Sequence, residues 1–223
     1  MIFLRQTWAI ARRDLLIEGR AGEVSAVVFP FAVVAVFVVP LASDTLAVRL
    51  GDLAAPVYWL IALLFGMHVT LRQTGSETRT QRRHLVLLGI DPAARIAGRA
   101  VSAAALTFAL LLATGPLVIL FYDPEPIPRL WVMVPTLLLF ASGLSLLATL
   151  AGDLTAGLRA RSALAPLIVV PLAIPLLVGA SQVLESLIRQ RSTLTGTLVL
   201  VLSDLALAAT VALAARALEE ATT

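Results

Sequence analysis

"VSAAALTFALLLATGPLVILFY", residues 101–122, contains twenty-two consecutive residues without a formal charge. A helix rises about 1.5 Å per residue, so a helix of this length crosses the roughly 30 Å of hydrocarbon in a bilayer. Similar uncharged runs recur along the chain. We therefore predict an all-α, polytopic membrane protein with six transmembrane helices in a single domain, residues 1–223. The other five predicted spans are residues 25–42, 54–71, 130–150, 163–184 and 193–215.

The overall composition agrees with a membrane protein. Of the 223 residues, 59% are hydrophobic and 14% are charged, whereas charged residues make up about 25% of a soluble protein. Cysteine is absent, which excludes disulfides, thiolate metal sites and cysteine nucleophiles. Lysine is absent too, so all seventeen basic residues are arginine. Because a net charge of +3 is spread between apolar spans, it favours membrane topology over nucleic-acid binding, and we expect no nucleic-acid partner.

The arginines are distributed unequally between the two sides of the predicted membrane domain. If the N-terminus is cytoplasmic, thirteen of the seventeen arginines lie in cytoplasmic segments. Basic residues are retained on the cytoplasmic side of bacterial membranes. We therefore predict that both termini are cytoplasmic. The four arginines on the outer side are Arg49, Arg129, Arg189 and Arg191.

The segment before the first span, residues 3–20, has the pattern of an amphipathic helix. Leu4, Trp8, Ala11 and Leu15 recur at helical spacing, and the arginines lie away from this stripe. We predict an interfacial helix with Trp8 at the level of the lipid headgroups and its basic residues, Arg12 and Arg13 among them, beside anionic membrane lipids. It is either a simple anchor or a helix that also steers the first span or docks another subunit.

The longest predicted connection is "RQTGSETRTQRRHLVLLGIDPAARIAGR", residues 72–99. It begins polar and rich in arginine, becomes apolar at residues 85–90, and turns at Pro92. One interpretation is that the apolar run packs beneath its own bundle. The other is a docking helix for a soluble partner, with apolar anchors inside a polar rim. In that hypothesis the anchors are Leu85, Leu87, Leu88 and Ile90, the turn contains Gly89 and Pro92, and the rim contains Arg82 and Arg83.

The fifth predicted span contains three prolines within an uncharged run. Pro166, Pro171 and Pro175 each lack a backbone donor and clash with the preceding turn of a helix. Membrane helices tolerate prolines where neighbours or local 3₁₀ turns satisfy the freed carbonyl groups. We therefore predict a bend or a break near the middle of this span. Such a helix suits a permease that changes shape, and it equally suits a static bundle with a kink.

Asp204 is a carboxylic acid within the sixth predicted span. A charge there costs about 2.5–3.5 kcal/mol on insertion scales, so such a residue faces protein or water. The two interpretations are a neutral, hydrogen-bonded side chain at a helix interface and a role in gating or subunit contact. The two histidines, His68 and His84, lie toward the predicted cytoplasmic side, and we expect packed or interfacial side chains rather than haem ligands.

Several segments resemble one known family. Six spans, an N-terminal interfacial helix and "LVLLGIDPAARIAGRA", residues 85–100, together resemble a type-2 ABC transporter permease. Within that group, the chain resembles the CcmB family, the haem exporter B permease of cytochrome c maturation. It departs from the family at Arg82, Arg83 and Gly89, and Glu77 is the best match to the family's acidic position. The segments that carry the family resemblance are "ARRDLLIEGR" (11–20), "VVFPFAVVAVFVVPLA" (27–42) and "APLIVVPLAIPLLVGAS" (165–181).

This resemblance implies a multi-pass protein of the bacterial cytoplasmic (inner) membrane that works in a complex with several partners. It implies a CcmA-like ATPase subunit, a CcmC-like haem-handling membrane protein, a small CcmD-like membrane protein, a CcmE-like haem chaperone and two permease copies. ATP belongs to the partner, because a Walker A motif requires a lysine and this chain has none. We expect no directly bound cofactor, and any contact with haem belongs to the assembled complex.

The resulting hypothesis is a permease subunit that couples ATP hydrolysis by another subunit to haem handling or to release of haem-loaded chaperone. One alternative is a type-2 permease for a lipid or a drug. Another is a membrane scaffold that transports nothing. An intramembrane enzyme is disfavoured, because the predicted spans contain no paired carboxylates, metal-ligand cluster or nucleophile with a base.

Overall fold

A computed structural model describes residues 2–22, 24–42, 49–75, 89–125, 129–155 and 161–220. Within these ranges every regular element is helical and no strand occurs, so the predicted all-α class is confirmed for the described part of the chain. The elements are α1 (Ile2–Ala21), the short π-helix η1 (Val24–Val28), α2 (Phe29–Ala42), α3 (Leu50–Gly75), α5 (Pro92–Tyr122), α6 (Leu130–Leu154), α7 (Arg161–Leu172), α8 (Ile174–Ile188) and α9 (Leu194–Glu220).

Four to six segments of the described chain have the length and hydropathy of a membrane span. Helices α3, α5, α6 and α9 qualify individually. Two further candidates are helix pairs: Ile2–Ala21 with Ala26–Ala42, bent by 52°, and Ala163–Leu172 with Ile174–Ile188, bent by 45°. The chain is therefore a multi-pass membrane protein, with between four and six candidate spans in the part that the structure describes.

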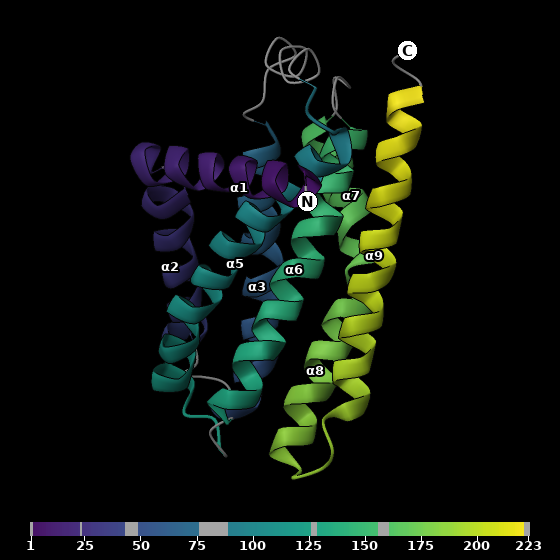
Figure 1. The fold of residues 1–223 in the computed structure, drawn as a ribbon. Helices are drawn as coiled ribbons and strands as arrows, with labels where there is room; N and C mark the ends of the chain where they lie inside the picture. Colours follow the sequence, from purple (N-terminus) through teal and green to yellow (C-terminus); the bar gives the residue numbers. More distant parts are fainter. Residues whose placement is uncertain are drawn as a thin grey trace.

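The helices form an upright bundle with α1 lying across one of its ends, as Figure 1 shows. We call this the α1 end. Helices α3, α6 and α9 finish there, and α5 begins there. At the other end, which we call the far end, α2, α5 and α8 finish. Helix α9 lies along the outside of the bundle and packs against α8 and α6 (Figure 1).

The apolar core lies where α3, α5, α6 and α8 meet. Phe140 and Leu144 of α6, Leu110 of α5 and Leu176 of α8 have no exposed surface. Each buried side chain of this size contributes about 1.5–3 kcal/mol in water. Within a bilayer, tight packing and hydrogen bonds replace that driving force. The buried hydroxyl group of Tyr58 accordingly donates a hydrogen bond to the Leu111 carbonyl oxygen, at 2.9 Å.

The predicted proline-rich span is broken near its middle. Helix α7 ends at Leu172, Ala173 forms a turn, and α8 continues at an angle of 45°. Neither Pro171 nor Pro175 has an amide hydrogen. Pro171 therefore cannot donate to the Leu167 carbonyl oxygen, and Pro175 cannot donate to the Pro171 carbonyl oxygen. Helical bonds remain between them, from Ala173 N to Val169 O (2.8 Å) and from Leu177 N to Ala173 O (3.0 Å). Pro166 lies inside α7, on the α1 side of the break.

The connection predicted at residues 72–99 is shorter than expected. Helix α3 continues to Gly75 and α5 begins at Pro92, so only residues 76–91 join them. The prediction ends each span at its nearest arginine, but α3 continues past the exposed Arg72, and α5 begins before Arg95 and Arg99, which are paired inside the protein. Asp91 sets the start of α5, because its side-chain Oδ1 accepts a hydrogen bond from Ala93 N at 2.8 Å. Pro92 then occupies the first helical position, where no amide donor is required.

Candidate functional site at the α1 end of the bundle

A cluster of buried charges lies at the α1 end of the bundle. Arg95 and Arg99 are one helical turn apart on α5, so their side chains lie on the same face. Both contact Asp153 in the last turn of α6: Arg95 Nη2 lies 3.6 Å from Oδ2, and Arg99 Nη1 lies 3.5 Å from Oδ1. The side chains of Arg95, Arg99 and Asp153 are only 10%, 4% and 0% exposed. Charges buried this deeply are tolerated in proteins only when they are paired.

The same cluster reaches helix α3. Arg99 Nη2 donates a hydrogen bond to the Gln73 carbonyl oxygen, at 3.3 Å. The Ser102 hydroxyl group lies 3.3 Å from the side-chain oxygen of Gln73 and 2.9 Å from the Arg99 carbonyl oxygen. The last turns of α3 and α6 are therefore joined to the first turns of α5. The end of α3 and the start of α5 are the points where the chain enters and leaves the connection of residues 76–91.

Helix α1 is attached to the end of the same connection. The side-chain amide of Gln6 donates from Nε2 to the Gly89 carbonyl oxygen (3.4 Å) and accepts from the Asp91 amide at Oε1 (3.3 Å). One amide side chain thus satisfies two backbone groups just before α5 begins. Gly89 has a φ of +70°, a left-handed conformation that favours glycine. The left-handed residue therefore lies where α1 holds the chain.

Close packing reinforces this attachment at Gly98. A Cβ atom added there would lie 2.7 Å from the Thr7 carbonyl oxygen and 2.8 Å from the Ile10 Cβ. The absence of a side chain at Gly98 lets the α1 and α5 backbones approach closely. Ile10 and Ala11 are the buried residues of α1. Helix α1, the start of α5 and the end of the connection are therefore held together.

The residues predicted on the interfacial helix point away from the bundle. Trp8 is 64% exposed, and Arg12 and Arg13 are exposed. Arg13 forms an ion pair with the neighbouring Asp14 at 2.9 Å. In the predicted apolar stripe, Leu4 is exposed and Ala11 is buried. The stripe therefore packs against the bundle at Ala11 and is exposed on the surface at Leu4. The exposed part of α1 is thus available to surroundings outside the protein.

The predicted docking segment falls mostly outside the described residues. Gly89 is exposed, Ile90 is half-buried, and Pro92 opens α5. The positions outside the description are Glu77, Arg82, Arg83, His84, Leu85, Leu87 and Leu88. The structure therefore describes where the predicted segment joins the bundle.

Asp204 lies half-buried between α9 and α6. The Ser142 hydroxyl group donates a hydrogen bond to Asp204 Oδ2, at 2.5 Å. The second carboxylate oxygen, Oδ1, is buried without a hydrogen-bond partner among the described residues. A Cβ atom at Gly143 would overlap this oxygen, so the glycine is what lets the carboxyl group lie against α6. The residue thus lies at a helix interface and is hydrogen-bonded there.

Potential metal ligands do not gather in the described ranges. No group of three histidine, cysteine, aspartate or glutamate side chains there is close enough to hold a metal ion. His68 is exposed on α3.

Arg95, Arg99, Asp153, Gln73 and Gln6 were not identified from the sequence. From the sequence, Arg95 and Arg99 count only toward the topology, and Asp153 lies between the predicted spans 130–150 and 163–184. The available signal was the four-residue spacing of Arg95 and Arg99 next to a span, because it places two cations on one helix face. Their acidic partner is more than fifty residues away, so local pattern does not identify it.

Comparison with known proteins agrees with the helical membrane bundle. The chain matches the CcmB protein family over residues 5–222. No curated protein matches it. The family match covers almost the whole chain, including α1, the buried charge cluster and the broken helix α7–α8. The chain therefore belongs to the CcmB family of ABC transporter permeases for cytochrome c maturation.

Proposed function

We propose that this chain couples ATP hydrolysis in a separate CcmA-like subunit to haem handling, or to the release of a haem-loaded chaperone, during cytochrome c maturation. The observation that carries the proposal is the Arg95–Asp153–Arg99 cluster, which joins the helices on both sides of the connection 76–91 to α6. A movement imposed on the connection needs such a rigid base to reach the membrane helices. Family membership supports the ABC arrangement.

The proposed topology has six spans and cytoplasmic termini. Helix α2 with η1 forms the first span, α1 lies on the membrane surface, and the bent pair α7–α8 forms the fifth span. The distribution of arginines supports the assignment of the α1 end to the cytoplasm. Arginines of α1, of the end of α3 and of the start of α5 lie at that end, whereas Arg49, Arg129, Arg189 and Arg191 lie at the far end.

Accessibility of single cysteines tests this topology, because the chain has no natural cysteine. Asp123→Cys, just after α5 at the far end, is expected to react with a membrane-impermeant maleimide in intact cells. Ser76→Cys, just after α3, is expected to react only after the membrane is opened. Labelling of Ser76→Cys but not of Asp123→Cys in intact cells would reverse the orientation.

The proposed contact with the ATPase lies in the connection 76–91. Leu87 and Leu88 are its apolar anchors, flanked by Leu85 and Ile90. Glu77, Arg82 and Arg83 form the polar rim around this contact. The turn at Gly89 and the helix start at Pro92 join the contact to α5, and Gln6 joins it to α1. A displacement of the connection is thereby transmitted to the surface helix and to the bundle together.

Two features inside the bundle suit a permease that changes shape. Pro171 and Pro175 each remove one helical hydrogen bond at the break, which makes α7 and α8 able to reorient relative to each other. Asp204 links α9 to α6 through Ser142 and retains a buried oxygen for another partner in a second arrangement. We assign Asp204 to gating or subunit contact on this basis.

The proposed complex contains two copies of this chain with the CcmA-like ATPase, and CcmC-like, CcmD-like and CcmE-like proteins. Affinity purification from the native membrane tests this composition directly. A CcmA-like ATPase and haem-handling proteins are expected among the retained proteins. Retention of a lipid-processing or drug-resistance ATPase instead would assign the chain to a different transporter, and retention of no ATPase would make it a scaffold.

A further inference from the structure

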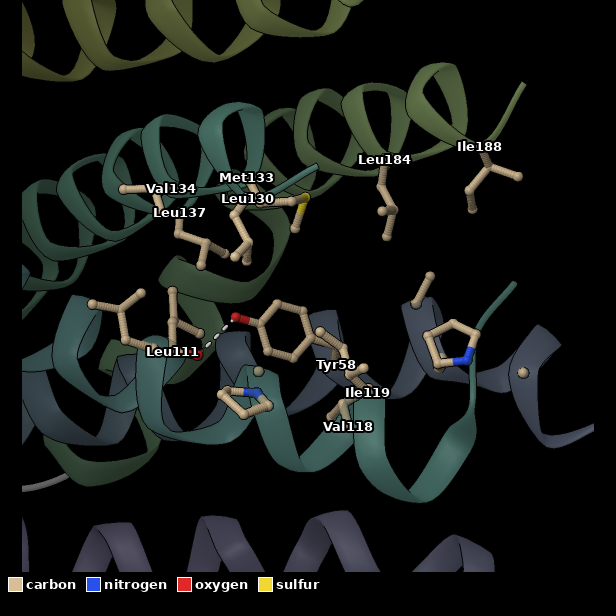
Figure 2. Close-up of a pocket in the computed structure, with 17 residues that line it drawn as sticks. Tyr58, Leu111, Val118, Ile119, Leu130, Met133, Val134, Leu137, Leu184 and Ile188 are labelled. Atoms are coloured by element: carbon tan, nitrogen blue, oxygen red, sulfur yellow. Dashed lines mark hydrogen bonds between the residues drawn. The ribbon is translucent and has the colours of Figure 1, made fainter. Parts of the chain in front are cut away.

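An apolar pocket of about 160 Å³ lies toward the far end of the bundle. Figure 2 shows α6 and α8 on one side of it, with Leu130, Val134, Leu184 and Ile188, and Tyr58 of α3 with residues of α5 on the other. No lining residue is charged. The hydroxyl group of Tyr58 is already bonded to the Leu111 carbonyl oxygen (Figure 2), so it offers its proton to no guest.

The pocket runs along helix α5. Its lining on α5 extends from Leu111 to Ile119 and continues to Pro124 beyond the helix. At about 1.5 Å per helical residue, the stretch from Leu111 to Ile119 is roughly 12 Å long. A pocket of about 160 Å³ along this stretch has room for part of one hydrocarbon chain. Apolar cavities of about this size, near 150 Å³, stay dry and bind apolar guests.

The pocket opens on the side of the bundle. Four of its lining residues are between 40% and 69% exposed: Leu112, Leu130, Val134 and Ile188. They belong to three helices with candidate-span character, α5, α6 and the pair α7–α8. An opening between such helices faces lipid, because the outside of a membrane bundle is in contact with acyl chains.

Two exposed arginines are close in sequence to residues that line the pocket at the far end. Arg129 directly precedes Leu130, and Arg191 follows Ile188 by three residues. Both are exposed, and neither forms an ion pair among the described residues. Arg189, which directly follows Ile188, is already paired with Glu185 at 2.8 Å. Guanidinium groups bind phosphate through two parallel hydrogen bonds.

From these features we propose that the pocket binds one acyl chain of a membrane phospholipid, whose phosphate lies at Arg129 and Arg191. The acyl chain occupies the groove between α5 and α6 with its end near Leu111. The headgroup stays at the far end, where the pocket meets the membrane surface. This lipid site goes beyond the permease function and requires only that the helices span a membrane.

Photo-crosslinking in reconstituted vesicles tests the site, using the chain with the partners that co-purify with it. The probe is phosphatidylglycerol with a diazirine at the end of one acyl chain, and it is expected to label the region of Leu111 and Leu112. A second probe with its diazirine near the headgroup is expected to label the region of Leu130. If the tail probe labels the outward-facing Leu120 and Leu138 as strongly as it labels Leu111 and Leu112, the labelling is ordinary lipid contact and the proposal is overturned.

Two variants separate the acyl site from the phosphate site. Gly115→Leu fills the pocket, and its Cβ atom has room because only Tyr58 Oη lies near, at 3.7 Å. Displacing the equivalent of two methylene groups is expected to lower tail-probe labelling about tenfold. The matched control is Gly19→Leu on α1, where nothing lies within 4 Å of an added Cβ. Unchanged labelling of Gly115→Leu would contradict the acyl site.

Arg129→Gln combined with Arg191→Gln tests the phosphate contact on exposed residues, independently of any effect of Gly115→Leu on folding. Wild-type protein is expected to be labelled more strongly by the phosphatidylglycerol probe than by diacylglycerol with the same diazirine chain. The double variant is expected to label equally with both, and Arg12→Gln at the other end is the control. Equal labelling of wild-type protein by the phosphatidylglycerol and diacylglycerol probes would overturn the phosphate contact. Labelling of the isolated chain that disappears in the complex would assign the pocket to a partner helix instead.

Discussion

Asp153→Ala is expected to lower the free energy of unfolding by about 3–5 kcal/mol, the typical cost of removing one partner of a buried ion pair. The reason is that Arg95 and Arg99 would remain buried after the carboxylate they share is lost. Unfolding of the purified protein in mixed micelles, followed by its helical circular dichroism, gives the difference. The helices α3, α5 and α6 are expected to separate at the α1 end first.

Glu185→Ala is the matched control for this prediction, because it breaks the pair with Arg189 at the far end. Both side chains of that pair are 57% exposed. Exposed pairs contribute about 0–1 kcal/mol, so the control is expected to lose far less. Combining Asp153→Ala with Arg99→Gln is expected to cost less than the sum of the two single changes, because the residues interact directly. Equal losses in Asp153→Ala and Glu185→Ala would mean that the cluster does not hold the α1 end together.

The double substitution Leu87→Asp and Leu88→Asp is expected to abolish retention of the ATPase subunit while leaving membrane insertion unchanged. Each change places a charge in the proposed contact, and loss of a binding hot spot alone costs about 2 kcal/mol or more. That corresponds to roughly a thirtyfold loss of affinity or more. The yield of ATPase recovered with the tagged chain measures the effect.

The control for the leucine pair places the same charges on the opposite side of the membrane. Leu46→Asp with Ala47→Asp lies between α2 and α3, in a connection expected at the far end. This variant is expected to retain the ATPase at the wild-type yield. If the Leu87 and Leu88 variant also retains it and supports cytochrome c maturation, the apolar run packs beneath its own bundle instead.

Uncharged length was sufficient to predict where the helices run. Residues 101–122 and 130–150 lie within α5 and α6, because a run of twenty apolar residues in a membrane has only the helix with which to satisfy its backbone. The break in residues 163–184 was predictable for an equally local reason, since Pro171 and Pro175 remove donors four residues apart. These features depend on neighbours in sequence alone.

The α1 end was not predictable in the same way. Charged residues end the predicted spans, so the prediction places residues 92–99 in a connection, although they form the first two turns of α5. Only the fold brings Asp153 to Arg95 and Arg99 and makes their burial favourable. The surface of α1 that meets the bundle at Ile10 depends likewise on Gly98, which is almost ninety residues away. Contacts between distant segments have no local signature.

The most direct measurement of the central claim is the ATPase rate of the partner subunit in proteoliposomes, compared with and without this chain. Coupling through the connection 76–91 predicts that the wild-type chain raises the rate and that the Leu87→Asp, Leu88→Asp variant does not. The Leu46→Asp, Ala47→Asp control is predicted to raise it as the wild type does. A rate that is the same with the wild-type chain, with the leucine variant and with no chain at all would contradict a coupling role.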